Sequence, residues 1–140
     1  MLLKRAVVFI LATVPLLLNC QSNPTKAKLQ VYQLGQPWEL KVGQTALIRG
    51  ENLKITFQAV EDWRCCSVCL CIWFSNAKIS LQISKLAGMP ETIELNSDLD
   101  PKEVGWNGYK IKLNWLAPYP QDPLPLPSEA YVANLVVTLE

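Results

Sequence analysis

Hydrophobic and polar residues alternate along five stretches of the chain, with the period of a β-strand that buries one face. The clearest stretch is 53–62, where lysine, threonine and glutamine separate the apolar positions. The same period recurs in 77–84, 91–96, 109–115 and 131–139. We therefore expect five strands with these inward-facing residues: Leu53, Ile55, Phe57 and Ala59; Ala77, Ile79, Leu81 and Ile83; Ile93 and Leu95; Tyr109, Ile111, Leu113 and Trp115; Tyr131, Ala133, Leu135, Val137 and Leu139.

Two shorter strands are expected in 38–49 (WELKVGQTALIR), on either side of Gly43-Gln44. Residues 97–108 are polar and carry Pro101 and an Asn107-Gly108 turn signal. No segment has a convincing period of 3.6 residues, so the pattern predicts an all-β protein. Six or seven strands at this spacing favour an antiparallel β-sandwich over a barrel.

Residues 118–127 (PYPQDPLPLP) hold five prolines in ten positions. Proline lacks the backbone N–H donor, so this segment is not expected inside a sheet. Such a run can serve as a polyproline II ligand for an aromatic-lined groove. A stiff crossover between two strands is the favoured interpretation.

The first 19 residues have the pattern of a secretory signal. Lys4 and Arg5 precede an apolar run over 6–18, which is shorter than the roughly 20 residues that a membrane span needs. The run ends in Leu17-Leu18-Asn19-Cys20, which resembles the lipobox of bacterial lipoproteins, although Asn19 replaces the usual small residue. The resemblance implies cleavage before Cys20 and acylation of its thiol, usually also of the new amine. A secreted chain with unmodified Cys20 is the alternative.

The expected organisation is a signal peptide over 1–19, a polar tether over 20–36 and a β-sandwich domain over 37–140. Acyl chains on Cys20 would bind the mature protein to a membrane surface in the bacterial cell envelope. Gln21 stands where an aspartate commonly retains lipoproteins at the inner membrane, so the outer membrane is favoured in a diderm source.

Composition narrows the function classes. The formal net charge is +1, and removing 1–19 leaves 11 basic and 12 acidic residues, which makes nucleic acid an unexpected partner. Histidine is absent, which removes the Ser-His-Asp and Cys-His nucleophile pairs and every zinc site that needs imidazole. No GxSxG, Walker-type or GxGxxG segment is present, so we expect a protein that is not an enzyme and carries no cofactor.

Four of the five cysteines lie within seven consecutive positions: Cys65, Cys66, Cys69 and Cys71. Export to an oxidising compartment favours disulfides, and four cysteines allow three connectivities. The same CCxxCxC run offers four thiolates suited to Cu(I) or Zn(II). Structural zinc sites usually draw ligands from two separated pairs, so disulfides are favoured and no metal site is predicted.

The segment around these cysteines resembles a family of uncharacterised bacterial exported proteins and lipoproteins with a β-domain and a core motif like E-D-S-R-C-P-x-x-V-x-C-x-W-x-G-x-A. The resemblance covers residues 38–140 and includes the flanks LKVGQTA and GYKIKLNWLAPYP. It implies a Cys65–Cys71 disulfide, which leaves Cys66 and Cys69 as a nested pair, and it carries no established activity. The chain matches the motif at Glu61, Asp62, Arg64, Cys65, Cys71, Trp73 and Ala77, and departs from it at Trp63, Cys66 and Phe74-Ser75.

Three residues beside the cysteines are candidates for ligand binding: Asp62, Trp63 and Arg64. Tryptophan and arginine dominate binding hot spots, so Arg64 flanked by Trp63 and Trp73 could anchor a ligand. An ion-pair cluster that orders the loop is the favoured alternative. Trp73 is expected to pack in the core beside a disulfide, as in other β-sandwiches.

Together these observations predict a membrane-anchored, non-enzymatic envelope module that binds a protein or another envelope component through its loops. A protease inhibitor that presents the cysteine-rich corner or the proline loop is the first alternative. A thiol or copper-binding protein that uses Cys65 to Cys71 is the second. The spacing Cys66-x-x-Cys69 fits redox chemistry, but no helix follows it to stabilise a thiolate.

Overall fold

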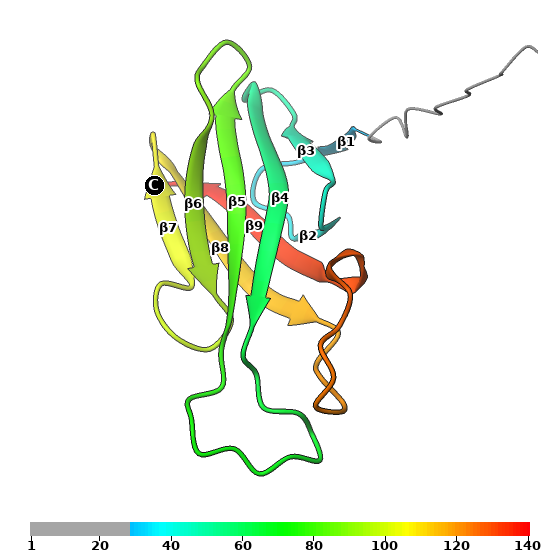
Figure 1. Ribbon diagram of the computed structural model, residues 1–140. Coiled ribbons are helices and arrows are strands. Elements are labelled where there is room, and N and C mark those ends of the chain that lie inside the picture. Colours follow the sequence, from blue (N-terminus) through cyan, green and yellow to red (C-terminus); the bar gives the residue numbers. More distant parts are fainter. Residues whose placement is uncertain (1–28) are drawn as a thin grey trace, which may run out of the picture.

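The computed structural model describes residues 29–140, so Cys20, the predicted signal and most of the predicted tether lie outside the described residues. The described part contains nine strands and one short 3-10 helix (Figure 1). Within it, no helix has the length and apolar character needed to cross a membrane. The elements are β1 (Gln30–Tyr32), β2 (Trp38–Lys41), β3 (Thr45–Ile48), β4 (Leu53–Asp62), β5 (Ala77–Lys85), β6 (Glu91–Asn96), β7 (Glu103–Trp106), β8 (Tyr109–Ala117), η1 (Ser128–Ala130) and β9 (Val132–Leu139).

The strands form two sheets, with the orders β1-β3-β4-β5-β6 and β2-β9-β8-β7. All pairings are antiparallel except that of β1 with β3, in which Gln30 pairs with Ala46. The predicted all-β sandwich is therefore confirmed. Two strands were not predicted: β1 lies inside the segment expected to be a tether, and β7 lies in the polar segment 97–108. The first sheet therefore already includes residues 30–32, which precede the expected start of the domain at residue 37.

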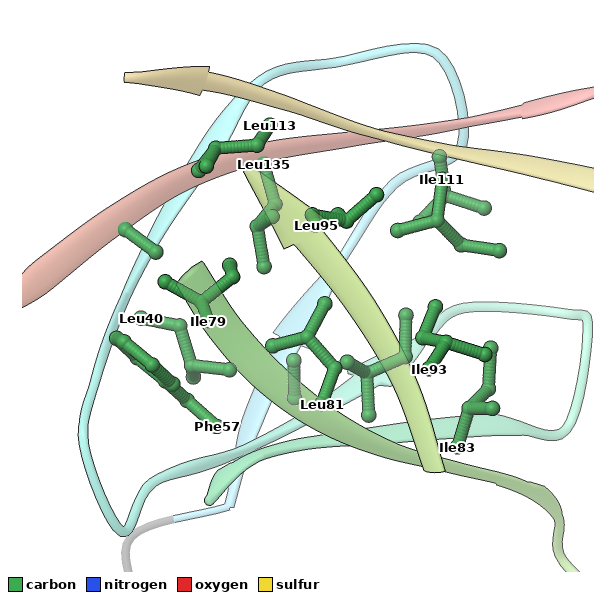
Figure 2. Packing of buried hydrophobic residues seen from close by; sticks show 14 of the residues in the cluster. Leu40, Phe57, Ile79, Leu81, Ile83, Ile93, Leu95, Ile111, Leu113 and Leu135 are labelled. Atoms are coloured by element: carbon green, nitrogen blue, oxygen red, sulfur yellow. The ribbon is translucent and has the colours of Figure 1, made fainter. Parts of the chain in front are cut away.

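The core lies between the two sheets and is built from their alternating apolar faces (Figure 2). Leu53, Ile55 and Phe57 of β4 are fully buried. Figure 2 shows Phe57 beside Leu40, which belongs to β2 of the second sheet. The predicted inward faces of β5, β6 and most of β8 and β9 are confirmed: Ala77, Ile79, Leu81, Ile83, Ile93, Leu95, Tyr109, Ile111, Leu113, Tyr131, Ala133, Leu135 and Val137 are all buried.

Three residues predicted to face the core do not. In β4 the register shifts between Phe57 and Ala59, so Ala59 is exposed. In β8 it shifts between Leu113 and Trp115, so Trp115 is 43% exposed and Leu116 is buried instead. A β-bulge adds one residue to a strand and reverses the inside–outside parity beyond it. Leu139 is also exposed, at the end of β9.

The two bulges precede the loops at one end of the sandwich, drawn lowest in Figure 1. Beyond the β4 bulge, Val60 and Asp62 occupy the partly buried positions, and Glu61 is exposed. The chain then enters the loop 63–76, which we call the cysteine loop. Beyond the β8 bulge it enters the loop 118–127, which we call the proline loop, and this loop leads through η1 into β9.

Candidate binding site at the cysteine and proline loops

Two disulfides close the cysteine loop. Cys65 is bonded to Cys71 with a Cα–Cα distance of 5.9 Å, and Cys66 is bonded to Cys69 with 5.1 Å. The inner pair encloses a turn in which the Cys69 amide donates to the Cys66 carbonyl at 3.0 Å. This is the pairing that the family resemblance implies, out of the three that the sequence allows.

Disulfide bonding engages the sulfurs that the copper alternative would need. Each thiolate ligand would have to come from reduction of one of the two bridges. Among residues 29–140, no group of three or more histidine, cysteine, aspartate or glutamate side chains is placed to hold a metal ion.

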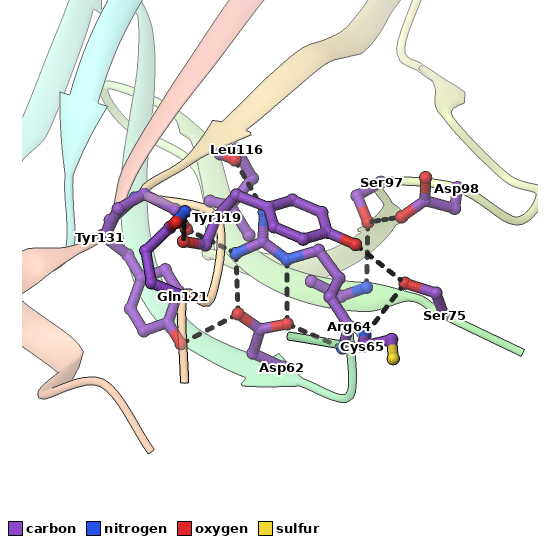
Figure 3. A network of polar contacts seen from close by, with 12 residues as sticks. Asp62, Arg64, Cys65, Ser75, Ser97, Asp98, Leu116, Tyr119, Gln121 and Tyr131 are labelled. Carbon is purple, nitrogen blue, oxygen red and sulfur yellow. Dashed lines mark hydrogen bonds and ion pairs between the residues drawn. The ribbon is translucent and has the colours of Figure 1, made fainter. Parts of the chain in front are cut away.

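Arg64 is held in a buried polar cluster, which we define as Asp62, Arg64 and Tyr131 (Figure 3). The guanidinium donates to both carboxylate oxygens of Asp62, at 2.9 Å from Nε and 2.6 Å from Nη2. It also donates to the backbone carbonyls of Leu116 at 2.8 Å and Pro118 at 2.7 Å. The Tyr131 hydroxyl donates to Asp62 at 2.9 Å. Arg64 therefore ties the end of β4 to the end of β8.

Burial and charge act in opposite directions on the pKa of Asp62. Desolvation alone would raise this pKa, but the hydrogen bonds and positive charge of Arg64, with a further bond from Tyr131, lower it below the usual value. Desolvation and the adjacent Asp62 carboxylate raise the pKa of Tyr131 to about 12. The cluster is thus an ionised carboxylate–guanidinium pair capped by a neutral phenol.

These contacts correct part of the binding prediction. The side chains of Arg64 and Asp62 are only 3% and 7% exposed, and their polar atoms are engaged within the protein. They are not available as a charged anchor for a ligand, and the favoured alternative, an ordering ion pair, describes their arrangement. The pair is buried rather than exposed, so removing one partner would leave an uncompensated buried charge and would cost far more than removing one partner of a surface pair.

The cysteine loop and the proline loop are docked against each other. The Ser67 amide donates to the Pro120 carbonyl at 3.1 Å, and its hydroxyl donates to Gln121 Oε1 at 3.1 Å. The Tyr119 ring lies 5.0 Å from the Arg64 guanidinium carbon, at cation–π distance. The proline run lies outside the sheet, as its composition predicts, but it joins the neighbouring antiparallel strands β8 and β9 and is therefore not a crossover. Its contact with the cysteine loop was not predicted.

Both loop tryptophans are largely exposed. Trp63 is 52% exposed, and Trp73 is 58% exposed with its Nε1 donating to the Trp63 carbonyl at 3.1 Å. The prediction that Trp73 packs in the core is therefore wrong. The cysteine loop extends past the ends of both sheets, so no second layer is present there to cover the indole.

The two loops enclose an open groove with a cavity volume of about 460 Å³, within the range of ligand pockets. The tryptophans, the disulfides and the proline loop contribute apolar groups to its lining, and the polar cluster also contributes to it. The lining residues are Val60, Asp62, Trp63, Arg64, Cys66, Cys69, Cys71, Trp73, Pro120, Asp122, Pro123, Leu124, Pro125, Leu126, Ser128 and Tyr131.

Beyond the groove, four apolar side chains of the cysteine loop point into solvent. Val68 is 79%, Leu70 101%, Ile72 102% and Phe74 86% exposed, and we call these residues the apolar tip. The chain has no charged residue from 65 to 77. Our sequence reasoning missed the tip, although that uncharged run of alternating cysteines and apolar residues was the signal that could have found it.

Comparison of the sequence with protein-family models, with curated proteins and with solved structures gives no match. Two features of the chain bear on its function: the geometry of the two loops and the predicted N-terminal signal.

Proposed function

We propose that this protein is a lipid-anchored, non-enzymatic module of the bacterial cell envelope that binds another envelope component through the apolar tip and the adjacent groove. The main support for this proposal comes from the loop end of the sandwich, where four apolar side chains are 79–102% exposed on a loop closed by two disulfides. Exposed apolar patches of this kind mark interaction sites. Membership of the exported β-domain family is part of the same proposal.

The electrostatics of the loop end support a binding role rather than catalysis. Arg64 donates to Asp62 and to two backbone carbonyls, and Asp62 accepts from Arg64 and Tyr131, so neither side chain is poised to transfer a proton to a ligand. The groove walls are mainly apolar. The lipobox-like sequence Leu17-Leu18-Asn19-Cys20 supports the lipid anchor, with acylated Cys20 as the proposed attachment point.

Crosslinking in living cells tests the binding role. A photoreactive amino acid replaces Leu70, and the matched control replaces Met89, which is 88% exposed in the turn after β5 at the opposite end of the sandwich. We expect covalent adducts with an envelope lipid or protein from position 70 and not from position 89. Equal labelling from both positions, or none from position 70, would contradict the proposal.

Mass spectrometry of the N-terminal peptide tests the anchor independently. We expect a peptide that begins at Cys20 and carries diacylglyceryl, with or without an amide-linked acyl chain. An unacylated Cys20 in a chain that retains residues 1–19 would contradict the anchor without affecting the crosslinking result.

A protease inhibitor is the second candidate, and one observation favours it. Leu70 and Ile72 are fully exposed on a loop that two disulfides hold rigid, and a rigid exposed loop lowers the entropy lost on entering a protease cleft. Inhibition of a serine or cysteine protease that is abolished by Leu70→Asp would support it. Absence of inhibition across a panel of both classes would remove it.

A further inference from the structure

The apolar tip is exposed and is held in place by the loop that carries it. Leu70 and Ile72 are fully exposed, so no part of the described protein shields them. The disulfides and the bond from the Ser67 amide to the Pro120 carbonyl hold the loop that carries them. The tip is therefore a preformed projection, and its burial in a partner requires little ordering of the chain.

The chemistry of the loop favours an apolar partner with few hydrogen-bonding requirements. No charged side chain occurs between 65 and 77, so the tip has no charge to match against a protein surface. Several polar groups are already engaged within the loops: the Cys69 amide with the Cys66 carbonyl, the Cys65 amide with Ser75 Oγ, and Trp73 Nε1 with the Trp63 carbonyl.

Exposed aromatic side chains accompany the apolar tip on the cysteine loop. Trp63 and Trp73 are each more than half exposed, and tryptophan is the residue enriched at membrane–water interfaces. The ion pairs of Lys78 with Glu61 at 3.5 Å and with Glu94 at 3.2 Å lie on the strands and not on the loop. The loop therefore presents apolar and aromatic groups, and the charged groups lie on the sandwich, as a contact with the bilayer interface requires.

The predicted anchor brings a lipid surface within reach. From Cys20 to Leu29, where the described chain begins, a fully extended chain spans at most about 30 Å. An acylated Cys20 would keep the sandwich at high effective concentration beside the membrane. The first described strand, β1, pairs with β3, and β3 pairs with the first half of β4. The cysteine loop follows the other end of β4, so the N-terminal segment and the tip lie towards opposite ends of that strand. Contact between tip and lipid therefore requires β4 to lie inclined to the surface.

We propose that the apolar tip enters the interfacial layer of the lipid bilayer to which Cys20 is attached, giving the protein a second membrane contact. This inference rests on the lipid anchor of the proposed function and names the bilayer as the component that the tip binds. Because irregular backbone is excluded from the hydrocarbon region, the tip reaches only the boundary of headgroups and acyl chains, about 5–10 Å deep. Asp122, which lines the groove on the proline loop, stays on the aqueous side.

Tryptophan quenching by brominated lipid tests the contact directly. The full chain is produced in a bacterial host that processes lipoproteins, purified in mild detergent and reconstituted into phosphatidylethanolamine–phosphatidylglycerol vesicles with or without brominated acyl chains. We expect bromine to quench part of the tryptophan emission. The W63F/W73F variant, which retains Trp38, Trp106 and Trp115, should lose most of that quenching.

Two matched variants assign the quenching to the tip. L70S/I72S/F74S keeps all five tryptophans and should lose the quenching, because the tip no longer holds the indoles at the interface. L86S/M89S removes exposed apolar side chains, 60% and 88% exposed, from the opposite end and should quench like the unaltered protein. Circular dichroism and a non-reducing peptide map verify that each variant has folded with its disulfides.

The outcomes separate this inference from the proposed function. Unquenched emission from a protein whose N-terminal peptide is acylated overturns the tip contact and leaves the anchor intact. Quenching that persists in L70S/I72S/F74S overturns it as well, as does a position-70 crosslink that captures only protein. An unacylated N-terminal peptide overturns the anchor, and with it the basis of this inference.

Discussion

Two members of the polar cluster, Asp62 and Arg64, are close in sequence to the apolar tip and opposite to it in character. Arg64 carries a full charge, and its side chain is 3% exposed. The Ile72 side chain has no polar atom, and the residue is 102% exposed. Most proteins bury residues of the second type and expose those of the first. The loop end of this sandwich therefore reverses the usual distribution, because a charged side chain is buried there and apolar side chains are exposed.

The contrast divides the two regions by role. Removing one partner from the cluster would leave a buried charge unpaired, so the cluster bears on the free energy of unfolding. The tip side chains are 79–102% exposed, so under the proposed function they bear on association rather than on stability. Substitutions in the two regions should consequently affect different measurements.

The largest expected effect is on stability, from Asp62→Asn. This substitution removes the negative charge beside the Arg64 guanidinium and should lower the free energy of unfolding by about 3–5 kcal/mol in urea titrations. The matched control is Glu61→Gln, one residue away, where loss of the exposed ion pair with Lys78 at 3.5 Å should have a much smaller effect, because solvent screens it. Equal effects of the two substitutions would refute the distinction between buried cluster and surface pair.

Removal of the outer disulfide should have the next largest effect. Closing the short loop between Cys65 and Cys71 stabilises the fold by about 2 kcal/mol in the chain-entropy model, so C65S/C71S should lose about that amount in urea unfolding. C66S/C69S removes the disulfide that closes a shorter loop, so this variant should lose less stability. A larger loss from the inner pair would mean that loop closure is not the dominant contribution.

Alkaline pH should weaken the cluster through Tyr131. Its pKa is about 12 in the folded protein against 10.0 for an unperturbed tyrosine. The stabilisation is therefore complete below pH 10 and declines as the pH rises towards 12, because the unfolded chain loses its proton first. Unfolding titrations should show a loss of about 1 kcal/mol from this residue by about pH 11. Tyr131→Phe should remove that component, and an unchanged pH profile would argue against the bond to Asp62.

The lowered pKa of Asp62 makes the stability of the folded protein depend on pH in the acidic range as well. Its contribution to stability is present above the usual pKa of 3.8 and is lost as the pH falls through the lowered folded-state value.

The smallest expected effect is at the tip. Ile72→Ala should change the free energy of unfolding by no more than about 0.5 kcal/mol, because the side chain is fully exposed. The same substitution at the buried Ile79 should destabilise by about 2–5 kcal/mol. A loss of more than about 1 kcal/mol at Ile72 would mean that the tip packs against the protein and is not a free binding surface.

Strand alternation predicted most of the core and failed where the chain departs from regular pairing. Strict alternation predicts that Ala59 and Trp115 face the core, because it keeps every second residue on the same side along a whole strand. The bulges in β4 and β8 break this alternation. The short strands β1 and β7 have little pattern of their own and owe their pairing to β3 and β8. Trp73 was assigned to the core by its proximity to a disulfide, which carries no information on whether a sheet covers the residue.

The sequence by itself determined the all-β class, most of the buried faces and the concentration of cysteines in one uncharged loop. These properties follow from the order of neighbouring residues, because strand period and local composition are short-range. Only the tertiary structure decided that Arg64 reaches the carbonyls of Leu116 and Pro118, and that the proline loop braces the cysteine loop. Those contacts join residues more than fifty positions apart, and their geometry depends on how two bulged strands from different sheets end beside each other.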